Sequence, residues 1–249
     1  MIELKIFGTS VEIADYSFDI LKTAETAALS FGSTYEGIFR RWRELCGGVK
    51  KTQLPALFPA DERLVDIADD GSNWGAARKS FIEHCGNASD SGRWARDADV
   101  YHRMLRDQFG EGTPVFDLIF LGIGPDGHTA SLFPDDCPTQ SDPAWNETVL
   151  ETTAPFVPPK RLTLGPDVIA STRHLLVTVT GSGKAEIFKK LMNELNAPEA
   201  YATANLPLLP PARIITRREE LKLNTEVLCD NAAAEKLAND ILQKYRVDI

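Results

Sequence analysis

The stretch "FDLIFLGIGPDGHTASLFP", residues 116–134, places an apolar run directly before a loop that is rich in glycine. The run "FDLIF" has the continuous apolar character of a strand that is buried on both faces of a parallel sheet. Gly122, Gly124 and Gly127 follow it with the spacing G-x-G-x-x-G, which is the fingerprint of a dinucleotide-binding loop. The stretch therefore predicts a strand, a tight turn and a ligand site in an α/β sheet.

The surroundings of these glycines argue against a dinucleotide. Such a site also needs an acidic residue that ends the next strand, about 20 residues further on. Glu147 and Glu151 lie at about that distance, but the intervening "PDDCPTQSDPAWNE" is a Pro- and Asp-rich loop instead of a helix followed by a strand. An NAD-dependent dehydrogenase is therefore disfavoured. His128 instead follows the last glycine, two residues after Asp126, where a general base could be held against a ligand.

Strand-like and helix-like segments alternate along the rest of the chain. This alternation is typical of βαβ units, which build a mostly parallel twisted sheet with helices on both faces. The Pro-rich pieces at 154–160 and 206–212 are short, so they are expected to be loops within a domain. We therefore predict a single α/β domain over residues 1–249. The expected strands are 2–7, 26–31, 54–58, 115–123, 161–165, 174–181 and 225–230, and the expected helices are 33–48, 75–86, 97–110, 183–195 and 231–245.

The composition disfavours several classes of protein. The net charge of −9 argues against binding to nucleic acid, which requires a basic surface to neutralise phosphates. No apolar run approaches the roughly 20 residues of a membrane span, so no membrane partner is expected. The N-terminal "MIELKIFGTSVEIADYSFD" is acidic and the first arginine of the chain is Arg40, unlike a signal or transit peptide. A cytoplasmic protein is therefore expected.

The four cysteines, Cys46, Cys85, Cys137 and Cys229, are far apart and form no C-x-x-C motif. This spacing indicates neither a zinc ribbon nor a redox pair. Scattered thiols fit a reducing compartment. All four are therefore expected to be buried free thiols that pack as small apolar residues.

Two further loops follow the ends of predicted strands and contain residues suited to binding a small anion. In "SFGSTYEG", Gly32, Ser33 and Thr34 precede a helix, so they either bind a phosphate with backbone N–H groups or simply cap the helix. In "TGSGKAEIF", Lys184 stands at a helix start, where a cation opposes the helix dipole unless an anion or solvent receives it. That loop is not a nucleotide P-loop, because the required first glycine and the Ser or Thr after the lysine are both missing.

A third loop, "PADERLVDIADDGSNW" at 59–74, gathers Asp61, Glu62 and Arg63 just after a strand. Because adjacent residues of a strand point to opposite faces, the triplet is expected in a loop rather than within a strand. It is either an ion-pair cluster at the surface or part of a site. The carboxyl ends of parallel strands meet at one edge of a sheet, so we expect all these loops to converge there.

Five motifs, in order along the chain, resemble those of the 6-phosphogluconolactonases, relatives of glucosamine-6-phosphate deaminase. They are "ALSFGST", "DERLVDIADDGSN", "FDLIFLGIGPDGHTASLFP", "PPKRLTLGPDVIASTRHLLVTVTGSGKA" and "LCDNAA", and they cover roughly residues 25–240. The resemblance implies a Rossmann-like fold of the sugar-phosphate isomerase type and hydrolysis of 6-phospho-D-glucono-1,5-lactone without a metal or an organic cofactor. The ligand would be a small sugar-phosphate lactone, and the enzyme would be a monomer or a homodimer.

The resemblance also implies the residues of the site. His128 would be the base that activates water, and Asp126 would orient its imidazole or bind substrate hydroxyls. Backbone N–H groups of the Gly-rich loop, helped by Arg63, would stabilise the oxyanion. The residues implied to bind the substrate and its phosphate are Gly32, Ser33, Thr34, Asp61, Glu62, Arg63, Ser72, Asn73, Gly124, Arg161 and Lys184.

The sequence departs from the family's pattern in its phosphate loop, where Phe31 and Tyr35 replace the first glycine and the proline of the usual G-G-S-T-P. The segment before residue 25 is short and poorly helical, so the family's first helix is expected to be curtailed or missing. Phe133 stands where the deaminases carry a glutamate that supports ring opening, so a deaminase or isomerase is disfavoured. A non-catalytic sugar-phosphate sensor is a further alternative, which the intact D-G-H disfavours.

Overall fold

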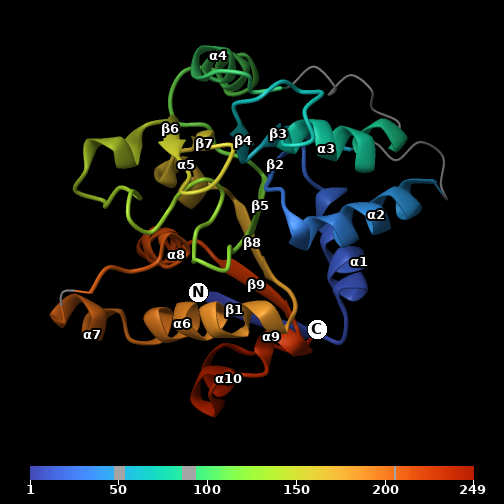
Figure 1. Cartoon of the computed structure of the whole chain (residues 1–249). Helices are drawn as coiled ribbons and strands as arrows, with labels where there is room; N and C mark the ends of the chain where they lie inside the picture. The colour runs from blue at the N-terminus through green and yellow to red at the C-terminus, as the bar shows by residue number, and fades with distance from the viewer. Residues whose placement is uncertain (48–53, 86–93, 205) are drawn as a thin grey trace.

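The computed structural model describes residues 1–47, 54–85, 94–204 and 206–249. Six parallel strands form the central sheet in the order β1-β9-β8-β5-β2-β3 (Figure 1), and three short antiparallel strands form a second sheet in the order β4-β7-β6. The expected α/β fold with a mostly parallel sheet is confirmed. The strands are β1 (Ile2–Phe7), β2 (Thr26–Leu29), β3 (Ala56–Pro59), β4 (Asp61–Arg63), β5 (Leu118–Gly122), β6 (Val149–Thr153), β7 (Lys160–Leu164), β8 (His174–Val179) and β9 (Thr225–Asp230).

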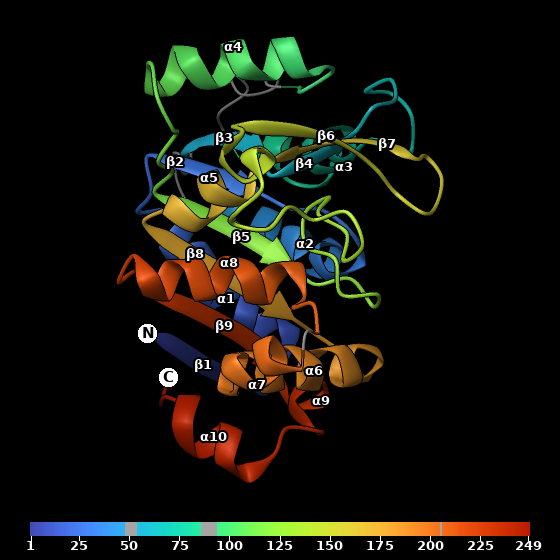
Figure 2. The ribbon, with the colours of Figure 1, turned by 90° about the vertical axis from the view of Figure 1, so that its left-hand side faces the viewer.

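Helices cover both faces of the central sheet, because its strands carry apolar side chains on both faces. In β5, Leu118 and Phe120 pack into one hydrophobic core with α1, α2 and α3, whereas Ile119 and Leu121 pack into a second core with α5, α6 and α8. Successive strand residues point to opposite faces, so a run without polar residues fits a strand between two layers. Figure 2 shows α5, α6 and α8 in front of the sheet, with α1 and α2 behind it.

The helices differ widely in length. None of those in the described ranges is long and apolar enough to cross a membrane. Their bounds are α1 (Ser10–Leu21), α2 (Ser33–Gly47), α3 (Asn73–Ser80), α4 (Ala98–Phe109), α5 (Pro166–Ser171), α6 (Ala185–Asn196), α7 (Pro198–Thr203), α8 (Pro210–Glu220), α9 (Asn231–Ala234) and α10 (Asn239–Tyr245), with the 3-10 turns η1 (Ile82–His84), η3 (Pro143–Asn146) and η4 (Ser182–Lys184).

The first helix, α1, is present, so the expectation that it is missing is wrong. It has 12 residues and begins with a capping box, in which the Glu12 N–H donates to Thr9 Oγ1 at 3.3 Å and the Thr9 N–H donates to Glu12 Oε2 at 2.9 Å. These two bonds satisfy backbone N–H groups that a helix start otherwise leaves unpaired. Ile13 and Phe18 are buried on the face that meets the sheet, and this burial stabilises the helix further.

The Asp61–Glu62–Arg63 triplet also corrects an expectation, because it forms a strand, β4, and not a loop. Asp61 lies opposite Thr163 and Arg63 lies opposite Arg161 in the antiparallel pair of β4 with β7. The alternation of side chains is the physical reason that three charged residues are tolerated there. Asp61 and Arg63 share one face, and Glu62 points to the other.

Three other segments fold differently from the prediction. The helix expected over 75–86 ends at Ser80 and is followed by the 3-10 turn η1, and Gly86 lies outside the described residues. Residues 231–245 form α9 and α10 instead of one helix, and the turn between them lets Leu237 pack against the core. The Pro-rich piece 206–212 is not wholly a loop, because Pro210 and Pro211 begin α8. Proline suits the first turn of a helix, where its missing N–H would have no partner.

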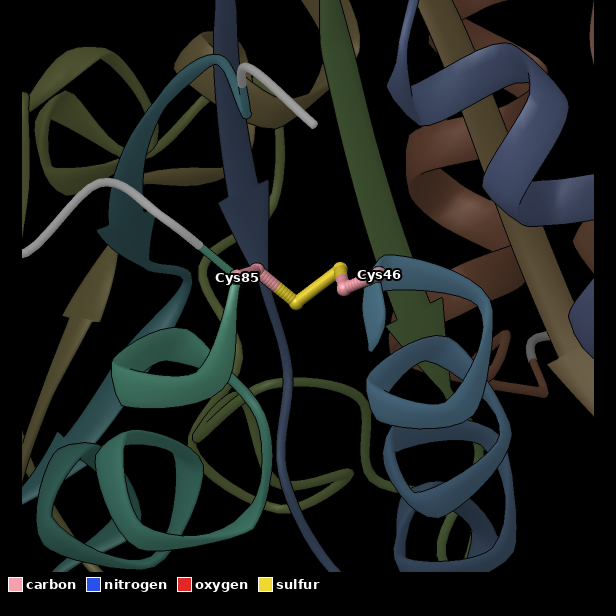
Figure 3. Close-up of a disulfide and its surroundings, with 2 residues drawn as sticks. All are labelled: Cys46 and Cys85. Atoms are coloured by element: carbon pink, nitrogen blue, oxygen red, sulfur yellow. A yellow bond between two sulfur atoms is a disulfide. The ribbon is translucent and has the colours of Figure 1, made fainter. Parts of the chain in front are cut away.

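Two of the four cysteines are not free thiols, which corrects the prediction for them. Cys46 near the end of α2 and Cys85 after η1 form a disulfide (Figure 3). Cys137 and Cys229 are buried free thiols, as predicted. The bonded pair lies 39 residues apart along the chain, so spacing alone gave no signal of the bond. Disulfides persist in oxidising surroundings, which the sequence had not indicated.

Candidate active site

A cavity of about 170 Å³ opens at the carboxyl ends of β2, β5 and β8, the edge of the sheet where the sequence predicts that the loops converge. The turn between β2 and α2, the face of β4, the glycine loop after β5 and the start of α6 all contribute to it. The lining residues are Ser30, Phe31, Gly32, Tyr35, Asp61, Arg63, Gly122, Ile123, Gly124, Pro125, His128, Ala130, Phe156 and Lys184.

The glycine loop holds His128 against Asp126. His128 Nδ1 lies 2.5 Å from Asp126 Oδ1, and the same oxygen accepts the His128 backbone N–H at 3.3 Å. A carboxylate at Nδ1 fixes the proton on that nitrogen and leaves the lone pair of Nε2 for another partner. Gly124 must be glycine, because a Cβ there would lie 2.2 Å from His128 Nδ1 and 2.6 Å from Asp126 Oδ1. Gly127 has φ of +92°, a conformation that glycine adopts without strain.

Charged residues of β4 and β7 lie beside this histidine. Asp61 Oδ2 accepts hydrogen bonds from Ser131 Oγ at 2.8 Å and Asn73 Nδ2 at 3.3 Å. Burial raises the pKa of Asp61, against the lowering effects of the Ser131 hydrogen bond and of the electrostatic interactions with His128 and Arg161. The structure thus brings Asp61 and the buried Arg161 close to His128, although they come from distant parts of the sequence.

The two arginines of this region are held by different partners. Arg63 lines the cavity and donates from Nη1 to the carbonyl oxygen of Gly71 at 3.1 Å. The Arg161 guanidinium lies 5.5 Å from the centre of the Phe156 ring, and burial lowers the pKa of this arginine. Phe156 also packs 6.0 Å from the His128 ring, so it links the arginine to the histidine.

Glu62, Ser72 and Asn73 lie behind the cavity wall. The Glu62 carboxylate accepts the backbone N–H groups of Asn73 at 2.7 Å, Trp74 at 2.8 Å and Arg63 at 2.7 Å. Burial raises the pKa of Glu62 to about 7, although these three hydrogen bonds oppose the shift. Ser72 caps α3 by accepting the Gly75 N–H at 3.0 Å. None of these three is among the described lining residues; Ser72 and Asn73 instead line a neighbouring cavity of about 240 Å³.

Lys184 and Gly32 line the same cavity as His128. Lys184 ends η4 directly before α6, and burial lowers the pKa of its ammonium group. The carboxylate of Asp230 anchors this turn by accepting the Gly181 N–H at 3.0 Å. Gly32 lines the cavity with φ of +131°. Ser33 and Thr34 begin α2, and their side chains lie outside what the structure describes.

Some residues around the cavity were not predicted from the sequence. Ser131 and Asp230 are polar residues whose partners lie far away along the chain, at Asp61 and Gly181. Asp230 belongs to the motif "LCDNAA", which was a signal for it; Ser131 follows the D-G-H loop but carries no signal of its own. In the described ranges there is no group of three or more His, Cys, Asp or Glu that could hold a metal ion.

A parallel α/β sheet with a polar cavity at the carboxyl ends of its strands defines a ligand-binding protein of the doubly wound class. The chain belongs to the family described as glucosamine-6-phosphate isomerases/6-phosphogluconolactonase, whose model matches residues 13–223.

Two curated relatives carry the same lactonase name. A probable 6-phosphogluconolactonase of Schizosaccharomyces pombe is 34% identical over 169 residues, which are 60% of this chain and 65% of that protein. The 6-phosphogluconolactonase of Bos taurus is 41% identical over 98 residues, which are 39% of this chain and 37% of that protein. The chain thus spans about two thirds of the length of one and about a third of the other.

Solved structures match over more of the chain. The crystal structure of devB protein superposes with a TM-score of 0.75 at 27% identity, covering 96% of this chain and all (100%) of that one. The 6-phosphogluconolactonase from Trypanosoma cruzi superposes with a TM-score of 0.70 at 24% identity, covering 96% of this chain and 97% of that one. At that lower identity the second likeness concerns the fold alone.

Proposed function

We propose that this protein hydrolyses 6-phospho-D-glucono-1,5-lactone to 6-phosphogluconate, a step of the oxidative pentose phosphate pathway, as a monomer or homodimer. The observation that carries the proposal is the contact of His128 Nδ1 with Asp126 at 2.5 Å, inside a cavity that Arg63 and Lys184 also line. The names of the curated relatives support the same substrate.

The reaction requires a base, an oxyanion site and an acid. In the proposal, Nε2 of His128 takes a proton from a water that attacks the lactone carbonyl, while Asp126 fixes the ring. The Arg63 guanidinium stabilises the oxyanion together with backbone N–H groups of the glycine-rich loop other than that of Gly124, which already donates to the carbonyl oxygen of His128 at 2.8 Å. The protonated His128 then gives its proton to the ring oxygen as the carbon–oxygen bond breaks. A δ-lactone is an activated ester, so these groups are sufficient and no metal or cofactor takes part.

The phosphate of the substrate is proposed to lie beside Lys184 and Gly32, which line the cavity. Lys184 supplies a positive charge there, and Gly32 with the first backbone N–H groups of α2 supplies hydrogen-bond donors at a helix N-terminus. Arg161 lies against Phe156 and is not among the described lining residues, so in the proposal it adds only a longer-range positive charge to a protein whose net charge is −9. Asp61 would meet the sugar hydroxyls, because its carboxylate would repel a phosphate.

The deaminase alternative is disfavoured by Phe133. This residue is 5% exposed, and its ring packs 5.0 Å from the His128 ring. A phenyl ring at that place cannot carry the proton that opening of an amino-sugar ring requires. The sensor alternative predicts binding without turnover.

An assay with freshly prepared 6-phosphogluconolactone separates the three alternatives. The lactonase accelerates its hydrolysis above the spontaneous rate, and the sensor binds it without acceleration. Release of ammonia from glucosamine 6-phosphate would instead establish the deaminase. Absence of acceleration at high enzyme concentration would contradict the proposal.

Replacement of Lys184 by alanine is expected to raise KM for the phosphorylated lactone by roughly 10- to 100-fold, because a charge-assisted hydrogen bond contributes about 1.5–3 kcal/mol. KM for unphosphorylated δ-gluconolactone should change little, since that lactone has no phosphate to lose. The exposed Lys189 in α6, the helix that follows Lys184, provides the control variant Lys189→Ala, which should behave as the wild type. Equal losses on both lactones would show that Lys184 supports the fold or the reacting centre instead.

A further inference from the structure

The side chain of Tyr35 is buried beneath the candidate active site, yet its hydroxyl has no partner. The residue is 1% exposed, and its ring stacks on Phe39 with centres 5.6 Å apart and meets Phe120 edge-on at 5.2 Å. Its hydroxyl would lie 3.3 Å from a Cβ built on Gly122, at the start of the glycine loop. Among the residues that the structure describes, nothing accepts or donates a hydrogen bond at this oxygen.

Two other buried tyrosines show that the fold normally satisfies this group. Tyr101 is equally buried, and its hydroxyl donates to the carbonyl oxygen of Pro59. Tyr245 donates to the carbonyl oxygen of Leu195 at 3.0 Å. A buried hydroxyl without a partner destabilises the fold, and phenylalanine would keep the ring contacts of Tyr35 without that cost. Packing of the fold therefore does not explain why this position holds a tyrosine instead of a phenylalanine.

The groups around this hydroxyl indicate a ligand that can both accept and donate hydrogen bonds. Tyr35 lines the same cavity as His128 and Asp61. Burial and the negative charge of Asp61 raise the pKa of Tyr35 well above its usual value, so the phenol stays protonated and can donate. Ser30 Oγ, also buried and without a partner in the described part of the chain, lines the same cavity. Its hydroxyl can donate or accept.

We propose that Tyr35, with Ser30, binds the hydroxyl-bearing sugar ring of the substrate and helps to determine which lactones the site accepts. A sugar hydroxyl can accept a hydrogen bond from Tyr35 and donate one to Asp61, so it satisfies both groups at once. A phosphate cannot do this, since Asp61 would repel it. The inference rests on the proposed lactone hydrolysis.

The test is the variant Tyr35→Phe, which removes one oxygen and keeps the ring. KM for 6-phosphogluconolactone should rise roughly 2- to 10-fold, the range of one neutral hydrogen bond, with kcat changed less than twofold. KM for unphosphorylated δ-gluconolactone should rise by the same factor, because both lactones carry the same ring hydroxyls. The melting temperature should stay the same or rise, since a buried hydroxyl without a partner is removed.

The matched control is Tyr101→Phe, whose hydroxyl bonds to the backbone away from the cavity. That variant should lower the melting temperature and leave both KM values unchanged. Equal KM values for the wild type and Tyr35→Phe, in an enzyme that hydrolyses the lactone, would overturn the role of Tyr35 alone. A rise for the phosphorylated lactone only would assign Tyr35 to the phosphate and overturn the hydroxyl contact. A wild-type protein without lactonase activity would overturn the proposed function and this inference together.

Discussion

Replacing His128 with alanine is expected to lower kcat for 6-phosphogluconolactone by roughly 10²–10⁴-fold, the usual contribution of a general base. The imidazole is the group in the cavity whose Nδ1 is held by a carboxylate and whose Nε2 is left to accept a proton. The fold should be unchanged, because the described contacts of this side chain are to Asp126 and to two phenyl rings that lie tilted to it. Steady-state rates, corrected for spontaneous hydrolysis, measure the effect.

The control for this experiment is His84→Ala. His84 is exposed and contacts only the carbonyl oxygen of Lys79, at 3.2 Å, among the contacts described for it. This variant should retain the wild-type rate. If folded His128→Ala kept more than about a third of the wild-type kcat, His128 would not be the base, and the mechanism would have to begin from another group of the cavity.

Loss of the disulfide should destabilise the protein by about 4 kcal/mol. The bond closes a loop of 39 residues, and the entropy that such a closure removes from the unfolded chain corresponds to about that free energy. Cys46→Ser, Cys85→Ser and the double variant should therefore unfold at lower denaturant concentration than the oxidised protein. Equilibrium unfolding in urea, with and without dithiothreitol, measures the difference.

Reductant supplies the internal control for the disulfide. Dithiothreitol should lower the unfolding midpoint of the wild type toward that of the double variant, and it should leave the double variant itself unchanged. The buried thiols Cys137 and Cys229 are present in every sample, so they cannot cause a difference. An unfolding midpoint of the wild type that does not respond to reductant would show that the bond contributes nothing to stability.

The elements that could be predicted from the sequence are those whose signal is local. The apolar runs of β5 and β8 identify buried strands, because a strand covered on both faces needs no polar residue. The strand β4 was missed because its pairing with β7 joins residues about a hundred positions apart and its own three residues are charged. The start of α1 carried a local signal, Thr9 with Glu12 three residues later, which outweighs the low helix propensity of the segment.

The same distinction applies to the candidate site: local signals could be predicted from the sequence, and long-range contacts could not. The D-G-H loop places Asp126 and His128 two residues apart, a spacing that allows their contact without requiring it, and the structure shows that the contact is made. The different positions of Asp61 and Glu62 could not be predicted, because they depend on β4 being a strand, which directs Asp61 toward the cavity and Glu62 toward the start of α3. The unpartnered hydroxyl of Tyr35 is visible only once its neighbours are known.

The position of β1 in the sheet sets the order in which the chain can complete its fold. In the described structure β1 pairs with β9 on one side, and on the other Leu4 forms a bridge with Arg246. Residues 8–224 separate the two partners, a long loop to close before any contact stabilises it. Of these strands, β1 is the first to leave the ribosome, and its partner β9 is the last. A nascent chain that stops before Thr225 would expose residues 2–7 as an open strand edge, the kind of surface on which chains aggregate.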